Sequence, residues 1–509
     1  MVLENLTPSR VWEIFENIFC ATPRESGQEG AVREKVKDYI SKQNISGISL
    51  HEDNMGNLLI RKQALPGFEK KPVLMLQGHL DVVCESNLVE GFDFKHLPIP
   101  VKISKDKKWV TADGTTLGAD NGIGCSIALA VMIADDLKHG PIELLLTVSE
   151  ETGLDGAFGL EVGKLAIQST RMISIDSEDL GVITIGSAGG GEIKITHNLE
   201  KSNLIKKIDD DLILVEISVS GLKGGHSGVD IHLPRANAIK LIGRIAGKIS
   251  DEIQIHLCSW NGGKRHNSIP REANVRFAIN RYELERVRDI VETQRKEILA
   301  YYNQIDNFNN KLEPDLKINM KQIGDSWNLA LNEVFSKKII SFVRILPHGP
   351  INFSPSIPNL VETSFNLAII NINLKENLFR INASVRSSIN TELEELRASV
   401  KDLAFQFGFE VTLNPAYPGW NPDPNSSFLE YVRKLYSCVV EGDIKIAAVH
   451  AGLECGIIAS KIPKLEGNVV AIGPTIHGAH TPSEKVRIHD VSVLYDLIKK
   501  IIEEMSDID

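Results

Sequence analysis

The sequence lacks the features expected of a disulfide-bonded, membrane-spanning or exported protein. Its longest apolar run, CSIALAVMIA at 125–134, is too short to cross a bilayer. The opening stretch MVLENLTPSRVWEIFENIF has no basic region followed by an uninterrupted apolar segment, so we expect an amphipathic helix there rather than a signal peptide. The six cysteines are scattered without a CxxC pair, which favours reduced thiols in the cytoplasm over a disulfide framework. They are Cys20, Cys84, Cys125, Cys258, Cys438 and Cys455.

Clustered positive charge is also missing. The chain has 56 lysines and arginines against 67 aspartates and glutamates, which gives a net charge of −11. A nucleic-acid-binding surface would need concentrated basic residues, so we expect no nucleic-acid partner. An apolar fraction of 42% over 509 residues is ample for a large core and for about three domains' worth of chain.

The first 190 residues alternate between strand and helix patterns. Strand-like runs occur in KPVLMLQGHLDVV (71–83), PIELLLTVSEE (141–151) and RMISIDSED (171–179), and ADNGIGCSIALAVMIADDL (119–137) is typical of a helix. Apolar strands that alternate with helices predict an α/β domain, with a mostly parallel sheet and helices on both faces.

The pattern changes after the glycine-rich GSAGGG stretch. LILVEISVSG (212–221) alternates with period two, as a half-buried antiparallel strand does. Two segments, 274–299 and 380–405, each indicate a strand followed by a helix, and in the second Thr391 and Glu394 form a predicted capping box. The pair fits an internal duplication and, equally, two unrelated αβ units. Because α/β patterns return after about residue 415, we infer one domain interrupted by another.

Histidine and acidic residues gather where the predicted strands of the first part end. The carboxyl ends of strands in an open α/β sheet form a common edge, where ligands bind. Several carboxylates at one edge would be costly to bury without a cation, and imidazole with carboxylate ligands suits zinc, manganese or cobalt. The candidates are His79, Asp81, Asp120, Glu150, Glu151 and Asp176.

Each candidate has an ordinary alternative when it is taken singly. The HxD pair at 79–81 can occur by chance, and the adjacent Glu150 and Glu151 can be solvated charges at the start of a loop. Asp120 can simply cap the helix that follows it. The joint pattern, in which successive strand ends all carry ligand-type residues, favours a metal site.

Motifs over nearly the whole chain resemble one enzyme superfamily. The sequence is similar to the dinuclear zinc peptidases and deacylases that include acetylornithine deacetylase and aminoacylase, and within them most similar to the aminoacyl-histidine (Xaa-His) dipeptidases. The stretches that carry the resemblance are EDNMGNLLIRKQALPG, LQGHLDVVCESN, TADGTTLGADNGIG, SEETGLDGA, GLKGGHSG, LVETSFNLA, YPGWNPDP, VHAGLECG and IGPTIHGAHTPSEKV.

The resemblance implies a role for each matching residue around two divalent metal ions, zinc first, with manganese or cobalt as alternatives. Asp120 would bridge the metals, His79 and Asp176 would complete one site, and Glu151 and His480 the other. Asp81 would hydrogen-bond His79, and Glu150 would be the general base. In the related enzymes a cis peptide bond follows the bridging aspartate, which here would be Asp120–Asn121.

Substrate-binding residues follow from the same resemblance. His226 would donate to the oxyanion, within one subunit or across to a partner subunit. Asn267 would contact the substrate nearby, and Arg386 would hold the free carboxylate. From the residues alone, His226 is equally a loop residue and Arg386 an exposed strand arginine.

The resemblance also implies a domain plan: a catalytic domain of residues 1–191 and 412–509, interrupted by a lid at 192–411. The lid is about twice as long as a single small αβ lid, which favours the duplicated form. A homodimer is implied by the resemblance alone.

The sequence therefore predicts a cytoplasmic metallodipeptidase that cleaves unsubstituted dipeptides of the Xaa-His type, including β-alanyl-histidine. One alternative is an N-acyl amino acid deacylase or a tripeptidase that uses the same dinuclear site. Another is a catalytically inactive binding or scaffold protein, which would normally have lost Glu150 or a metal ligand.

Overall fold

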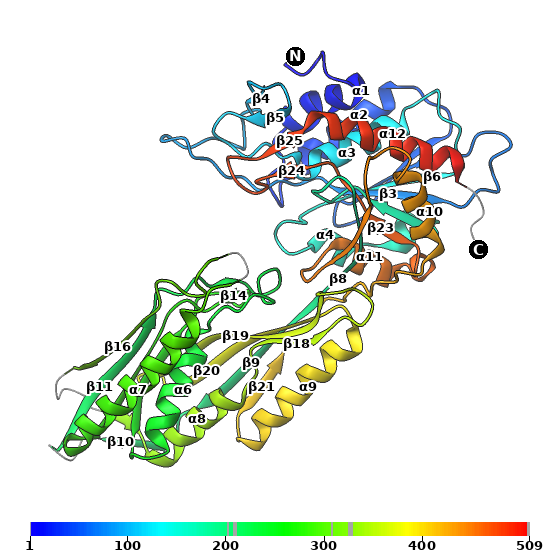
Figure 1. The fold of residues 1–509 in the computed structure, drawn as a ribbon. Coiled ribbons are helices and arrows are strands. Elements are labelled where there is room, and N and C mark those ends of the chain that lie inside the picture. The colour runs from blue at the N-terminus through cyan, green and yellow to red at the C-terminus, as the bar shows by residue number, and fades with distance from the viewer. Residues whose placement is uncertain (1, 201–202, 207–210, 307–308, 324–328, 506–509) are drawn as a thin grey trace. The chain divides into compact units, whose positions relative to one another are not determined.

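The computed structural model describes residues 2–200, 203–206, 211–306, 309–323 and 329–505 (Figure 1). The chain forms two compact units: unit 1 is Met1–Ser187, Trp420–Ala448 and Leu453–Asp509, and unit 2 is Ala188–Gly419 with Val449–Gly452. The expected boundaries at 191/192 and 411/412 fall inside strands β9 (Gly189–Asn198) and β21 (Glu410–Leu413). Both strands pair within unit 2, so the structure places the boundaries outside them.

Unit 1 is an α/β domain, as predicted, built on an eight-stranded sheet of order β1-β2-β6-β3-β7-β23-β8-β22. Its central strands β6, β3, β7 and β23 are parallel, whereas β1, β2 and β8 pair antiparallel at the flanks. These central strands are buried at every position because both faces of the sheet are covered. The strands are β1 (Ile48–Glu52), β2 (Leu58–Lys62), β3 (Leu74–His79), β6 (Ile142–Thr147), β7 (Arg171–Ser174), β8 (Val182–Ser187), β22 (Lys445–Val449) and β23 (Val469–Ala471).

Helices cover both faces of this sheet, as Figure 1 shows. On one face Met75, Leu145 and Met172 pack against residues of α4 and α11. On the other, α3 packs against β3 and is flanked by α1 and α12. The helices are α1 (Ser9–Ile14), which continues into a π-helix (Phe15–Cys20), α2 (Gly30–Lys42), α3 (Ala119–Met132), α4 (Asp155–Gly159), α5 (Val162–Leu165), α10 (Ser427–Tyr436), α11 (Glu454–Lys461) and α12 (Ile488–Glu504). A smaller four-stranded sheet contains β4 (Val101–Ile103), β5 (Trp109–Ala112), β24 (Ile476–His477) and β25 (Lys485–Arg487).

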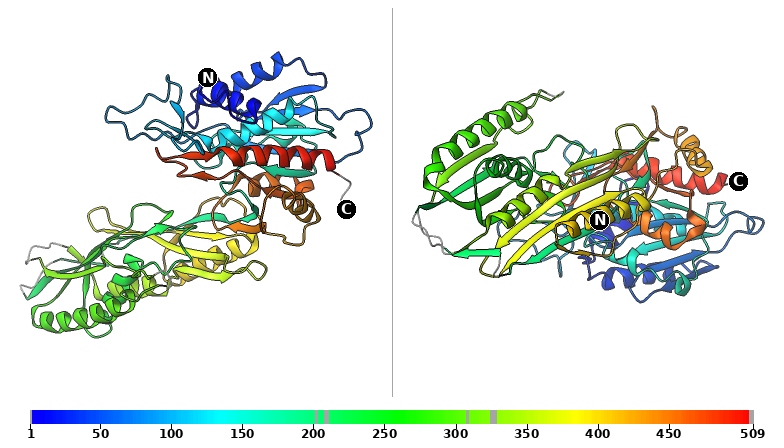
Figure 2. Two further views of the ribbon diagram at one scale, coloured as in Figure 1. Left: turned by 45° about the horizontal axis from the view of Figure 1, so that its top comes forward. Right: turned by 90° about the horizontal axis from the view of Figure 1, so that it is seen from below.

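Unit 2 is one antiparallel sheet of order β16-β11-β15-β13-β19-β20-β9-β21, with β18 paired to β19. Alternate residues such as Ile213, Val215 and Ile217 of β11 enter a single core with the helices, and their neighbours lie on the opposite, largely polar face. Figure 2 shows the helices gathered on one side of these long strands. The bounds are β11 (Leu212–Ser220), β12 (Gly225–His226), β13 (His256–Gly262), β14 (Ser268–Ile269), β15 (Ala273–Asn280), β16 (Lys317–Gln322), β18 (Gly349–Phe353), β19 (Val361–Asn373), β20 (Leu378–Ser387), α6 (Ala238–Ser250), α7 (Leu284–Tyr302), α8 (Glu333–Ile345) and α9 (Asn390–Gln406). A short pair, β10 (Leu204–Lys206) and β17 (Leu329–Leu331), lies beside the sheet.

Both predicted strand–helix units exist, as β15–α7 and β20–α9, and they share one continuous sheet. The predicted capping box is wrong. Helix α9 begins at Asn390 with Ile389 at its N-cap, which makes no side-chain cap, and Glu394 instead accepts from Arg397 at 2.6 Å. The buried Arg397 draws the carboxylate along the helix, away from the first turn.

The described residues include no pair of bonded cysteines, and all six thiols are free. Among the same residues, none of the helices has the length and apolar character required of a bilayer-spanning segment.

Candidate functional site

Asp120 lies at the centre of a cluster at the carboxyl edge of the unit 1 sheet. Its Oδ1 is 3.0 Å from Nε2 of His79, the last residue of β3, and its Oδ2 is 3.0 Å from Nε2 of His480. Nε2 of His480 also lies 2.9 Å from Oε1 of Glu151. One carboxylate therefore faces two imidazoles that are 401 positions apart in sequence. The ligand-type atoms of His79, Asp120 and Glu151 all lie within 4.8 Å of one another.

Asp176 joins the cluster from the loop after β7. Its Oδ1 is 3.5 Å from Nε2 of His79 and accepts a hydrogen bond from Nδ2 of Asn121 at 3.0 Å. The peptide bond between Asp120 and Asn121 is cis, as the resemblance implied. Asn121, the residue that follows Asp120, thus holds the Asp176 carboxylate in place.

Asp81 lies behind His79 and is fully buried. Its Oδ1 is 3.3 Å from Nδ1 of His79, while Nε2 of the same ring points at Asp120. The backbone N–H groups of Glu150 and Glu151 donate to the two oxygens of Asp81 at 3.0 and 3.1 Å. Despite burial, hydrogen bonds and the charge of His79 hold the pKa of Asp81 below its usual range. This carboxylate therefore orients both the imidazole and the turn that carries the two glutamates.

Glu150 and Glu151 leave the sheet in a tight turn after β6. Ser149 has a φ of 51°, and the Glu150 carbonyl accepts from the N–H groups of Gly153 and Leu154 at 3.1 and 2.8 Å. The Glu151 carboxylate faces His480. Burial raises the pKa of Glu150 well above its usual range, and neighbouring carboxylates raise it further. The two adjacent glutamates thus have different surroundings within one site.

The donor set fits divalent cations. Four carboxylates, from Asp120, Glu150, Glu151 and Asp176, surround two imidazoles, and such an excess of buried negative charge is costly unless a cation neutralises it. Oε1 of Glu151 is buried and, among the described residues, has no hydrogen-bond partner of good geometry. Nitrogen and oxygen donors without a thiolate suit zinc, manganese or cobalt.

Sequence reasoning gave no role to two further buried glutamates. Oε2 of Glu484 accepts from the N–H groups of Leu117 and Gly118 at 2.7 and 2.8 Å, and its Oε1 accepts from that of Asp120 at 3.1 Å. Oε2 of Glu454 accepts from Thr147 and Gln77, each at 2.6 Å, and burial raises the pKa of Glu454 to about 8. Both lie in stretches that carry the family resemblance, HTPSEKV and LECG, but only the fold shows what they contact.

The three predicted substrate-binding residues lie in unit 2. His226 on β12 pairs with Ser268 on β14, and Ser227 N–H donates to the Asn267 carbonyl at 2.8 Å, which brings His226 and Asn267 together. Arg386 on β20 is buried, and its guanidinium lies 3.5 Å from Nε2 of His226.

Backbone hydrogen bonds favour one tautomer of His226. Its Nδ1 accepts from the N–H groups of Gly228 and Val229 at 3.3 and 3.1 Å, which favours the neutral tautomer with its proton on Nε2. Burial, together with the charge of Arg386, lowers the pKa of His226 and keeps the ring neutral. Nε2–H is therefore available as a hydrogen-bond donor. Arg386 is oriented by the hydroxyl of Tyr417, to which it donates at 2.7 Å.

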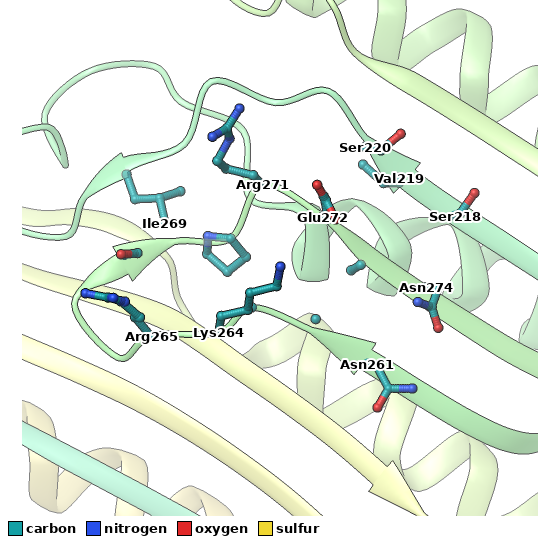
Figure 3. A pocket seen from close by; sticks show the side chains of 15 residues that line it. Ser218, Val219, Ser220, Asn261, Lys264, Arg265, Ile269, Arg271, Glu272 and Asn274 are labelled. Carbon is teal, nitrogen blue, oxygen red and sulfur yellow. The ribbon is translucent and has the colours of Figure 1, made fainter. Parts of the chain in front are cut away.

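A cavity of about 580 Å³ opens on the polar face of the unit 2 sheet (Figure 3). The residues that line it include Lys264, Arg265, Ile269, Arg271 and Glu272. None of the predicted site residues lines this cavity, although Arg265 and Ser268 are close neighbours of Asn267 in sequence.

An α/β unit with a histidine–carboxylate cluster at the carboxyl edge of its sheet has the organisation of a metal-dependent hydrolase. The sequence model of the peptidase family M20/M25/M40 matches residues 75–504. The chain belongs to this peptidase family.

Individual relatives are similar over the whole length. A cytosol non-specific dipeptidase of Escherichia coli (strain K12) is 36% identical over 506 residues, which cover 99% of each chain. The crystal structure of an aminoacylhistidine dipeptidase from Vibrio alginolyticus has a TM-score of 0.88 and 33% identity, covering 99% of this chain and 98% of that one. A tripeptidase from Staphylococcus aureus, with a TM-score of 0.53, 15% identity and 98% coverage of both chains, shares the fold.

Proposed function

We propose that this protein is a metal-dependent dipeptidase that hydrolyses unsubstituted dipeptides, with Xaa-His substrates, including β-alanyl-histidine, among them. The observation that carries the proposal is the Asp120 carboxylate, whose two oxygens each face an imidazole Nε2 at 3.0 Å. A carboxylate in this position can bridge two cations, each of which takes further ligands from the side chains around it.

Asp120 would be the bridging ligand. His79 and Asp176 would hold one ion, and Glu151 and His480 the other. Two zinc ions fit this donor set, and manganese or cobalt would fit it as well. When bound, such ions polarise a carbonyl oxygen and lower the pKa of a water molecule.

Glu150 is the proposed general base. It lies beside the candidate ligand Glu151 in sequence, and burial favours its uptake of a proton. Its carboxylate would take a proton from the attacking water and deliver it to the leaving amine nitrogen as the C–N bond breaks. Asp81 would keep Nε2 of His79 directed at the metal by accepting from Nδ1.

Unit 2 would supply the substrate contacts. Nε2–H of His226 is a neutral donor suited to the oxyanion of the tetrahedral intermediate. Asn267, held beside His226 through the Ser227–Asn267 hydrogen bond, would contact the substrate nearby. The Arg386 guanidinium would bind the free carboxylate, for which an arginine fork is well shaped.

The proposed substrate class and location rest on the names of two relatives. The E. coli relative is named a cytosol non-specific dipeptidase and the V. alginolyticus relative an aminoacylhistidine dipeptidase. We accordingly propose a dipeptide substrate and a cytoplasmic location. The proposed homodimer rests on the family resemblance of the sequence alone. One name indicates a broad substrate specificity and the other a preference for histidine, so the preference for histidine substrates is the property to measure.

A small substrate panel tests the proposed function. The purified protein, loaded in turn with zinc, manganese or cobalt, is given β-alanyl-histidine, Ala-His, Ala-Leu, a tripeptide and N-acetyl-histidine. We expect cleavage of the free dipeptides only, lost on addition of chelator, and faster turnover of the histidine substrates. The ranking of Ala-His against Ala-Leu measures the contribution of the histidine side chain.

Other outcomes of the panel separate the alternatives. Cleavage of N-acetyl-histidine alone would assign the protein to the deacylases, and preference for the tripeptide would assign it to the tripeptidases. Absence of turnover with every metal would favour a binding or scaffold protein.

Arg386→Ala is expected to raise KM for the cleaved dipeptide by about 10–100-fold, because a hydrogen-bonded charge on the substrate loses its partner. Metal affinity should stay at the wild-type value. The matched control is Arg380→Ala, which removes an exposed arginine from the same face of β20 and should leave KM unchanged. Equal losses of substrate and metal binding in Arg386→Ala would instead show that the buried arginine stabilises unit 2.

A further inference from the structure

A short turn near the N-terminus, residues 24–29 (RESGQE), contacts the loops that carry the candidate metal-site residues. The turn lies outside the part of the chain that the family model matches, which begins at residue 75. Three of its polar side chains, those of Arg24, Ser26 and Glu29, each bond to a different part of the site. We call residues 24–29 the bracing turn.

Ser26 acts on the Asp81 carboxylate. Its hydroxyl donates to Oδ2 of Asp81 at 2.7 Å, and the Glu151 N–H donates to the same oxygen at 3.1 Å. Oδ1 of Asp81 accepts from the Glu150 N–H and faces His79. Without the Ser26 hydroxyl, the carboxylate would lose a donor that opposes its rotation away from His79.

Glu29 acts on the turn before the two glutamates. Its Oε1 accepts from both the backbone N–H and the hydroxyl of Ser149, at 2.9 and 3.1 Å, and also from the N–H of Gly27 at 2.7 Å. Ser149 has a positive φ, and Glu150 follows it directly. The Glu29 carboxylate, which is 5% exposed, therefore ties the bracing turn to the residue that sets the direction of Glu150.

Arg24 acts through backbone carbonyls. Its guanidinium, only 1% exposed, donates to the carbonyls of Leu80 and Asp81 at 3.0 and 2.8 Å and to that of Gly118. It also donates to the Phe19 carbonyl at 3.1 Å. Leu80 and Asp81 follow His79 directly, and Gly118 precedes Asp120 by two residues. One buried cation thus joins the two loops that carry the central pair of the cluster.

We propose that the bracing turn is a positioning element of the active site. It holds Asp81, the Ser149–Glu151 turn and the Asp120 loop at fixed positions relative to one another. The inference rests on the proposed function for the identity of the metal ligands. Ser26 is its most informative residue, because removal of one hydroxyl tests the element without exposing a buried charge.

The test compares Ser26→Ala with Ser26→Thr, which restores a hydroxyl. Cobalt binding to the metal-free protein is followed by calorimetry and visible absorption, and kcat and KM are measured on the dipeptide that the wild type cleaves best. Ser26→Ala should weaken cobalt binding and lower kcat by about 10-fold each, the lower end of what loss of an outer hydrogen-bond partner costs, with KM unchanged. Ser26→Thr should restore both values.

A second serine provides the matched control. The hydroxyl of Ser104 also donates to a carboxylate, that of Asp106, on the exposed surface of unit 1. Ser104→Ala should keep wild-type cobalt affinity and kcat. The unfolding midpoint of each metal-free variant is measured alongside.

The outcomes separate this inference from the proposed function. Wild-type values in Ser26→Ala, or a lower unfolding midpoint with unchanged cobalt affinity, would overturn the bracing role while leaving the dipeptidase intact. A wild type that binds no cobalt would overturn the proposed function and the bracing role together. A wild type that binds cobalt but cleaves no dipeptide would overturn the proposed function alone, because the cobalt measurements still test the brace.

Discussion

Glu150→Ala is expected to abolish dipeptide hydrolysis while the protein still binds two metal ions. A positioned general base contributes about 10²–10⁴-fold to the rate, and the fall in kcat should lie in or beyond that range. Glu150→Gln, which keeps the shape but cannot take the proton, should be equally inactive. Turnover is measured with saturating substrate, and bound metal is counted by calorimetric titration.

The control for Glu150→Ala is Glu90→Ala, which removes an exposed glutamate from unit 1 and should leave turnover and metal content unchanged. Activity that survives in Glu150→Ala would transfer the base role to another carboxylate. Glu454 would then be the next to substitute, since it is buried in the same unit and burial raises its pKa to about 8. Loss of metal with loss of activity would make Glu150 a ligand.

Asp120→Ala is expected to lower metal affinity at both sites and to reduce hydrolysis to the level of the chelator-treated wild type. Both candidate sites share this carboxylate, since its two oxygens face His79 and His480. The loss of affinity should exceed the about 10–100-fold that removal of an outer partner costs. Zinc titration of the metal-free protein gives the number of ions bound and their affinities.

Asp176→Ala provides the comparison, because Asp176 lies 3.5 Å from His79 and would serve one ion only. Its titration should keep the site of Glu151 and His480. If Asp120→Ala and Asp176→Ala each remove a single ion, the bridging assignment would fall. The cluster would then hold its metal ions without a shared carboxylate ligand.

The apolar pattern and the residue types of short segments were enough to predict which side chains gather at the carboxyl edge of the unit 1 sheet. The buried strands β3 and β6 are short apolar runs, and the residues that follow them are ligand types, so parallel strands bring them to one edge. The cis bond at Asp120–Asn121 followed from resemblance and is present. The position of His480, by contrast, could be assigned only by resemblance, because nothing in its own loop pattern directs it to a residue 360 positions earlier.

Residues that act through backbone groups escaped prediction. Glu484, Arg24 and Glu29 bond mainly to backbone N–H and carbonyl groups. Because nearly every residue has these groups, the sequence does not indicate which residue will be the partner. The capping box failed for a related reason. Thr391 and Glu394 have the right spacing, but the tertiary partner Arg397 and the strand that precedes the helix set where α9 begins.

The sequence by itself determined the α/β class of unit 1, the strand–helix composition of unit 2 and the candidate residues of the metal cluster, because apolar periodicity and residue type are local properties. Only the tertiary structure decided which atoms face one another. It placed one Asp120 oxygen against each imidazole, directed two backbone donors at Nδ1 of His226, and brought residues 24–29 into hydrogen bonds with residues of three loops. These arrangements depend on contacts between distant segments, whose geometry is set by the packing of the whole unit.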